Sequence, residues 1–192
     1  MNATMLAPAR PVRSAQPAKS MPVKVVVLGG RAVGSTRVEL SDAFVGAVSE
    51  LPTEPTILPY GRCAVSNRVS VHVYGMPAQQ RYWFMWDALA SGAVAALILA
   101  DATRLADCFA ALDYAAERGL PYLVAVTNAA RYGAAEVRDA LSVPAEVPVL
   151  LVDEFAEAAR PARDVLHTLV RHAVNRRNWT LVTAASATRA AC

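Results

Sequence analysis

A strand that runs into a glycine-rich turn near the start of the chain most constrains its fold. Residues 23–28 are mostly β-branched and apolar, as in strands buried on both faces of a parallel sheet. The turn keeps both glycines and the final hydroxyl of the phosphate-binding pattern G-x-x-x-x-G-K-[ST], but Ser35 stands where the lysine belongs. Its residues are Gly29, Gly30, Arg31, Ala32, Val33, Gly34, Ser35 and Thr36. Because backbone amides form most of such a cradle, the segment is either a weakened phosphate site or an ordinary turn between a strand and a helix.

Strand-like apolar runs alternate with helical patterns along the rest of the chain, which is typical of a parallel α/β sheet. We expect further strands at about residues 69–74, 94–100, 122–127 and 149–152, and an edge strand near 56–58 within an otherwise irregular segment from 51 to 67. We expect helices at about residues 36–48, 80–90, 105–118, 134–141 and 161–175. The pattern predicts one domain over residues 22–178, between a disordered basic arm (1–21) and a frayed tail (179–192).

Charge and composition argue against several functions. The net charge of +3 equals the three basic residues of the first twenty, so the folded body is nearly neutral and does not favour nucleic-acid binding. The basic arm allows at most a peripheral membrane association, and the longest apolar run, 93–100, is much shorter than the roughly 20 residues of a membrane span. Three cysteines without metal spacing favour a reducing cytoplasm. No serine or histidine has the context of a hydrolytic site.

Two stretches in the middle of the chain carry a family resemblance. Residues 74–87 (YGMPAQQRYWFMWD) and 101–109 (DATRLADCF) are similar to the Ras-like GTPases of actinobacterial conservons, which are related to the gliding-motility MglA group. A weaker likeness extends over residues 23–175. The resemblance implies a P-loop NTPase fold of the small-GTPase type, with a mainly parallel six-stranded sheet flanked by helices. It also implies GTP or GDP with Mg²⁺ as ligands, Thr36 at the metal, and a roadblock-fold protein as a signalling partner.

Departures from the family pattern point away from GTP hydrolysis. The family usually reads G-T-P-G-Q where this chain reads G-M-P-A-Q, which leaves Gln79 as a vestigial candidate for orienting water. Thr127 and Ala130, with Asn128 between them, stand where the base-recognition asparagine and aspartate belong, and Arg31 replaces a loop glycine. We therefore predict a pseudo-GTPase that acts by protein contact and needs no nucleotide. The alternative is an unconventional small GTPase that still binds and slowly hydrolyses GTP.

Four large aromatic rings crowd into residues 82–86. Successive residues of a helix are about 100° apart, so these rings cannot all face one core. In Ras-like proteins the matching segment is the second switch, which contacts regulators. We predict that Tyr82, Trp83 and Trp86 form a partner-binding surface, because exposed Trp and Tyr are favoured interface anchors. The alternative is that the rings pack on neighbouring loops of the same molecule.

Overall fold

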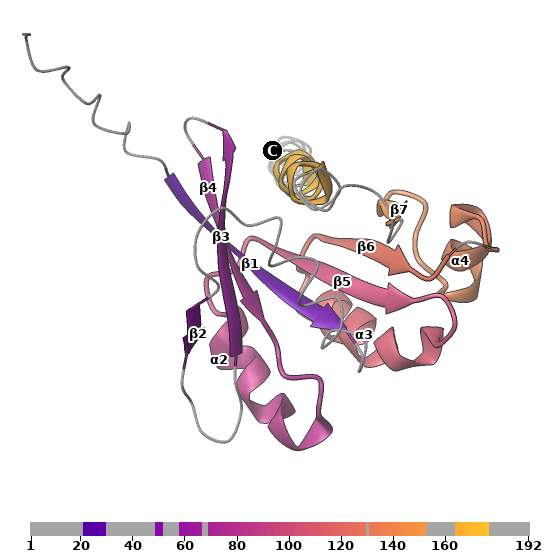
Figure 1. Cartoon of the computed structure of the whole chain (residues 1–192), viewed down its shortest axis with the longest axis horizontal. Coiled ribbons are helices and arrows are strands. Elements are labelled where there is room, and N and C mark those ends of the chain that lie inside the picture. The colour runs from indigo at the N-terminus through magenta and orange to yellow at the C-terminus, as the bar shows by residue number, and fades with distance from the viewer. Residues whose placement is uncertain are drawn as a thin grey trace, which may run out of the picture.

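The computed structural model describes residues 21–29, 49–51, 58–66, 69–129, 131–152 and 164–176. These residues form one sheet with helices on both of its faces (Figure 1). Residues 1–20 of the predicted basic arm, the predicted helix 36–48 and the predicted tail lie outside the described residues. Residues 30–36 of the phosphate loop also lie outside them, so the structure describes that loop only at Gly29.

The sheet has the mainly parallel arrangement that the sequence predicts. Its strands are β1 (Met21–Gly29), β2 (Ser49–Leu51), β3 (Leu58–Ser66), β4 (Val69–Gly75), β5 (Ala95–Asp101), β6 (Tyr122–Thr127) and β7 (Val149–Leu151), in the order β2-β3-β4-β1-β5-β6-β7. β3 runs antiparallel to both of its neighbours, β2 and β4, and the other neighbouring pairs are parallel. The predicted α/β fold class is confirmed, with the three-residue β2 added at one edge of the six expected strands.

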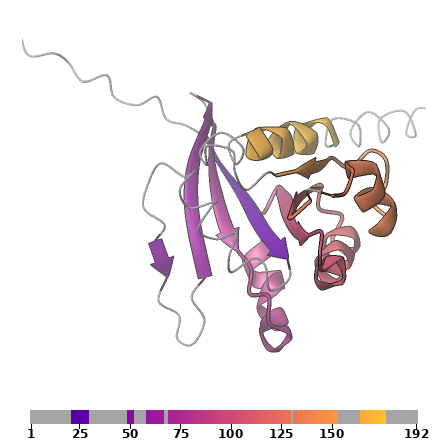
Figure 2. The same ribbon diagram turned by 45° about the vertical axis from the view of Figure 1, so that its right-hand side comes forward.

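The central strand β1 divides the core into two layers. Val25, Val26, Val27 and Leu28 are at most 4% exposed. Val26 and Leu28 face α2, α3 and α4, whereas Val25 and Val27 face the helix formed by residues 164–176. Figure 2 shows this helix in yellow along one side of the sheet, away from the other helices. Burial on both faces explains why residues 25–28 of β1 are all apolar and three of them are β-branched valines.

The prediction of an irregular segment at residues 51–67 is wrong for residues 58–66, whereas residues 52–57 and 67, which include most of the predicted edge strand near 56–58, lie outside the described residues. Prolines and glycines suggested an irregular segment, but residues 58–66 form β3 and pair along β4. Tyr60 lies opposite Tyr74 with ring centroids 5.0 Å apart, and the register shifts between Ala64 and Ser66. Cross-strand aromatic pairs stabilise a sheet through contacts between residues distant in sequence, and a bulge accommodates irregularity. The prolines and glycines of this segment therefore led to an incorrect prediction of irregular structure.

The described helical segments agree with the predicted positions but differ in geometry. They are η1 (Gln80–Met85), α2 (Trp86–Ala90), η2 (Leu105–Cys108), α3 (Phe109–Glu117), α4 (Ala134–Ala140) and residues 164–176. The single helix expected at 80–90 is a 3₁₀ helix followed by a short α-helix. Within the described part of the chain, no helix is both long and apolar enough to cross a membrane.

The packing of the helix at residues 164–176 yields a stability prediction. Leu169 is fully buried among Leu97, Leu99 and Leu166, whereas Val174 on the same helix is 51% exposed. We expect Leu169→Ala to lower the free energy of unfolding by about 2–5 kcal/mol, because it leaves a cavity in a packed layer. Val174→Ala should change it by no more than about 0.5 kcal/mol. Urea denaturation followed by circular dichroism measures both, and equal effects would contradict the observed docking of this helix.

Candidate functional site

The carboxyl ends of the parallel strands meet at one edge of the sheet. Gly29 ends β1, Gly75 ends β4, Asp101 ends β5 and Thr127 ends β6. In open α/β sheets, ligands bind outside these ends, where connections leave the sheet in opposite directions. Here the chain goes from β1 to strands on one side, and β5 lies on the other. This edge is therefore the candidate site.

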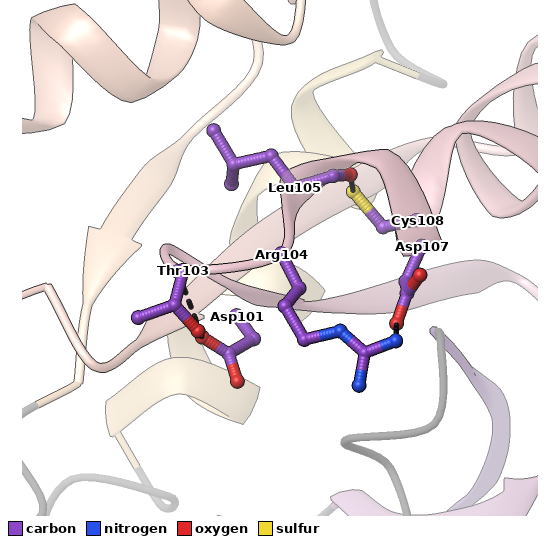
Figure 3. Close-up of polar contacts among 6 residues, drawn as sticks. All are labelled: Asp101, Thr103, Arg104, Leu105, Asp107 and Cys108. Atoms are coloured by element: carbon purple, nitrogen blue, oxygen red, sulfur yellow. Dashed lines mark hydrogen bonds and ion pairs between the residues drawn. The ribbon is translucent and has the colours of Figure 1, made fainter.

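Asp101 organises the turn that leaves β5 (Figure 3). Its Oδ1 accepts hydrogen bonds from the backbone N–H of Thr103 at 2.8 Å and from the Thr103 hydroxyl at 2.6 Å. The backbone N–H of Arg104 donates to the Asp101 carbonyl at 2.9 Å. An aspartate that binds the backbone two residues later forms such a turn from local sequence alone. The carboxylate therefore has a structural role in this turn.

Asp101 also ties β5 to the end of β6. The Asn128 side chain donates a hydrogen bond to its carboxylate, and Asn128 adopts a left-handed φ of 55°, which asparagine tolerates. Partial burial of Asp101 by itself would raise its pKa. The hydrogen bonds from Thr103 and Asn128 and the nearby charge of Arg104 outweigh that effect and hold the pKa below its ordinary value of 3.8. The Asp101 carboxylate is therefore ionised at neutral pH, and it already accepts hydrogen bonds from donors of this chain.

Thr127 does not fit a guanine site. It is 4% exposed, and its hydroxyl donates to the Ala100 carbonyl at 3.4 Å, within the chain. The next residue, Asn128, is bound to Asp101, and Ala130 lies outside the described residues and has no polar side chain. Selecting guanine requires a carboxylate that accepts hydrogen bonds from the base. The carboxylate that the structure places at the ends of β5 and β6 is that of Asp101, which already accepts hydrogen bonds from within the chain. Thr127 serves the connection between β5 and β6 instead.

The loop after β4 leaves the sheet next to β1. The backbone N–H of Met76 donates to the Val27 carbonyl at 2.8 Å, and the Met76 side chain is only 3% exposed. Gln79, the vestigial catalytic candidate, is exposed and precedes η1 with an extended backbone. Its side chain makes no capping hydrogen bond to η1. Its predicted role therefore remains a prediction.

Other chemically reactive groups near this edge have structural roles. The Cys108 thiol donates to the Leu105 carbonyl at 3.1 Å, and burial raises its pKa to about 11, so it is protonated at neutral pH. Arg104 and Asp107 form an ion pair at 3.0 Å at the start of η2 (Figure 3). In the part of the chain that the structure describes, no three His, Cys, Asp or Glu side chains could together hold a metal ion.

The structure divides the predicted aromatic surface into exposed and buried rings. Tyr82 and Trp83 are partly exposed, but Trp86 is only 4% exposed and packs against Trp83 and Tyr114. Trp86 is therefore not available as a surface anchor, which corrects that part of the prediction. Phe84, which the prediction did not include among the anchors, is 79% exposed. Helical periodicity could not show this, because a 3₁₀ helix has three residues per turn.

Our sequence-based predictions assign Asp101 no role of its own. An aspartate directly after a buried strand, with a threonine two residues later, is the local signal of the observed turn. Its bond to Asn128 joins the ends of two strands and has no such signal. Packing of β5 against β6 is what brings these two residues together.

Comparisons with known proteins identify the fold. No family model matches the chain, and no curated protein sequence matches it. The cytosolic domain of the T. maritima FeoB iron transporter in apo form superposes with a TM-score of 0.59 at 19% identity, over 80% of this chain and 64% of that one. The FeoB G domain from Methanococcus jannaschii gives 0.56 at 16% identity, over 80% of this chain and 98% of that one. This chain thus spans just under two thirds of the T. maritima cytosolic domain and has the P-loop fold of small G domains.

The internal role of Asp101 makes a pH-dependent prediction. Since its pKa is lowered in the folded state, its carboxylate contributes stability above pH 3.8, and this contribution is lost as the pH falls further through the lowered pKa. We expect Asp101→Asn to destabilise the protein at pH 7, by an amount that shrinks when urea denaturation is repeated near pH 3. Asp113→Asn, which removes an exposed carboxylate from α3, is the matched control. A difference between wild type and Asp101→Asn that stays constant with pH would argue against this role.

Proposed function

We propose that this chain is a pseudo-GTPase, a small-GTPase scaffold that acts by protein contact and lacks efficient GTP hydrolysis and tight nucleotide binding. The observation that carries the proposal is Thr127, which is buried and directs its hydroxyl to the Ala100 carbonyl, at the position where base recognition is expected. The sequence adds Ser35 in place of the loop lysine and Ala130 in place of the base aspartate. The charged contact to phosphate and the contacts to the base are thus altered, whereas the loop glycines and the Thr36 hydroxyl are kept.

The free energy of the lost contacts gives the expected loss of nucleotide affinity. A hydrogen bond to a charged group contributes about 1.5–3 kcal/mol, so losing the lysine and the aspartate removes roughly 3–6 kcal/mol. That corresponds to about 10²–10⁴ in affinity if the two contributions are additive. The loss of the aspartate removes the preference for guanine. Arg31 retains a positive charge on the loop but leaves the backbone at another position.

The proposed setting is a conservon-type signalling system in the cytoplasm, with a roadblock-fold protein as the partner. Support comes from the resemblance of residues 74–87 and 101–109 to conservon GTPases and from the exposed aromatic side chain of Phe84 in the second-switch segment. Exposed large rings of this kind are commonly interface anchors.

The second candidate is an unconventional small GTPase. It is favoured by the fold similarity to a T. maritima FeoB cytosolic domain described in a GDP form, with a TM-score of 0.60 at 18% identity over 81% of this chain and 65% of that one. In this case the backbone amides of the phosphate loop and Arg31 would hold the phosphates, and Thr36 would hold Mg²⁺.

Nucleotide content distinguishes the two functions. We expect protein purified without heating and then denatured to release no stoichiometric guanine nucleotide, because the charged contacts for both phosphate and base are missing from the sequence. We also expect no Mg²⁺-dependent GTP turnover above background. Chromatography of the released fraction and calorimetry with GTP provide the measurements. A sub-micromolar GTP affinity would establish the second candidate instead.

Restoring the missing groups provides the complementary test. We expect the double variant Ser35→Lys with Ala130→Asp to bind GTP more tightly than wild type, by up to about 10²–10⁴-fold, because each substitution restores a charge-assisted contact. The matched control is Ser35→Lys alone, which restores phosphate binding without guanine preference and so should bind ATP and GTP similarly. A double variant that binds no better than wild type would show that the lost charges are not the reason for weak binding.

A further inference from the structure

Tryptophans in the segment after β4 attach that segment to the body of the protein. The indole Nε1 of Trp86 donates to the Pro77 carbonyl at 2.9 Å, and that of Trp83 donates to the Ala78 carbonyl at 3.3 Å. The buried Trp86 ring packs edge-on against Tyr114 of α3, with centroids 5.1 Å apart. Both indole N–H groups therefore have partners within the chain, and the loop and η1 are connected to the same helix.

A polar contact adds a second connection between α2 and α3. The Asp87 carboxylate accepts a hydrogen bond from the Tyr114 hydroxyl at 3.1 Å and forms an ion pair with Arg118. The Arg118 and Asp87 side chains are 51% and 58% exposed, so this pair contributes little by itself. The buried Trp86 ring provides most of the attachment. We call Trp83, Trp86, Asp87, Tyr114 and Arg118 together the tryptophan clamp.

The clamped segment displays one aromatic ring. Phe84 is 79% exposed, the largest exposed fraction among the large hydrophobic residues that the structure describes. The Arg81 guanidinium lies 4.8 Å from the Tyr82 ring centroid, and Arg81 is the one charged residue among positions 79–84. In Figure 2, α2 and its neighbouring 3₁₀ helix project from the lower end of the body, away from the yellow helix. Because side chains three residues apart in a 3₁₀ helix lie one above the other, Arg81 and Phe84 share one face of η1, which thus combines an exposed ring with a positive charge.

We propose that Phe84 is the anchor of the docking surface, and that its partner is a protein with an apolar pocket and a carboxylate at the rim of that pocket. The charge of Arg81 selects the acidic rim, since Asp87 is already paired with Arg118. This inference rests on the proposed function. In it, Phe84 takes the place of Trp86 as an anchor. The clamp contacts join residues 77–87 to α3 and are all made between described residues, so in this proposal they preorganise the surface without nucleotide.

Calorimetric titration with a roadblock-fold protein, the partner of the proposed function, tests this inference. Relative to wild type, we expect Phe84→Ala to weaken binding about tenfold or more. We expect Arg81→Glu to weaken binding more strongly at low salt than at high salt, because salt screens exposed charges. Both variants should keep the wild-type melting temperature, because these side chains are exposed. Tyr132→Ala, which removes another exposed ring, is the matched control and should bind as wild type.

The clamp has a separate readout. Trp86→Phe keeps an aromatic ring but removes the N–H bonded to Pro77, so amide hydrogen exchange at residues 79–87 should become faster. Adding GTP and Mg²⁺ to wild type should leave that exchange unchanged, and a nucleotide-dependent change would overturn the preorganised surface. If wild type binds and Phe84→Ala binds with the same affinity, Phe84 is not the anchor, and the proposed function is unaffected. No binding by wild type would overturn the roadblock partnership and the docking assignment together.

Discussion

Burial of β1 on both faces is the constraint on which the rest of the structure depends. Its residues Val25–Leu28 pack into two separate layers while the backbone pairs with β4 on one side and β5 on the other. Each such side chain contributes about 1.5–3 kcal/mol when buried, and a slip of one residue would exchange the two layers. The register of β1 is therefore fixed. It places the start of the phosphate loop, the loop after β4 and the Asp101 turn at one edge of the sheet.

Under the proposed function, hydrogen bonds within the chain replace contacts to a ligand at that edge. Thr127 bonds to the Ala100 carbonyl, and Asn128 and Thr103 bond to Asp101, so the ends of β5 and β6 are joined to each other. A G domain that needs no nucleotide still has to satisfy the polar groups at this edge, because unpaired buried groups destabilise the fold. The same edge thus becomes part of the scaffold. This is consistent with a protein whose activity resides in its surface.

The segment of residues 77–87 is also held by contacts within the chain. In a switch that responds to nucleotide, few contacts should favour one conformation strongly, since a ligand can shift an equilibrium only by its differential affinity for the two states. Here Trp86 is buried and both indoles are bonded within the chain, which favours one conformation in the absence of ligand. The aromatic residues that first suggest a binding surface are therefore of two kinds. Two tryptophans attach the segment, and Phe84 is presented by it.

The sequence by itself determined the α/β fold class and the positions of β1, β4, β5, β6 and β7, because buried parallel strands are encoded as continuous apolar runs. It also showed that Ser35 stands at the lysine position of the phosphate-binding pattern, since a motif is a matter of residue identity and spacing. Only the tertiary structure decided that β3 forms despite its local breakers, that Asn128 bonds to Asp101, and that Trp86 is buried while Phe84 is exposed. These features depend on contacts between residues distant in sequence, and no local pattern specifies such contacts.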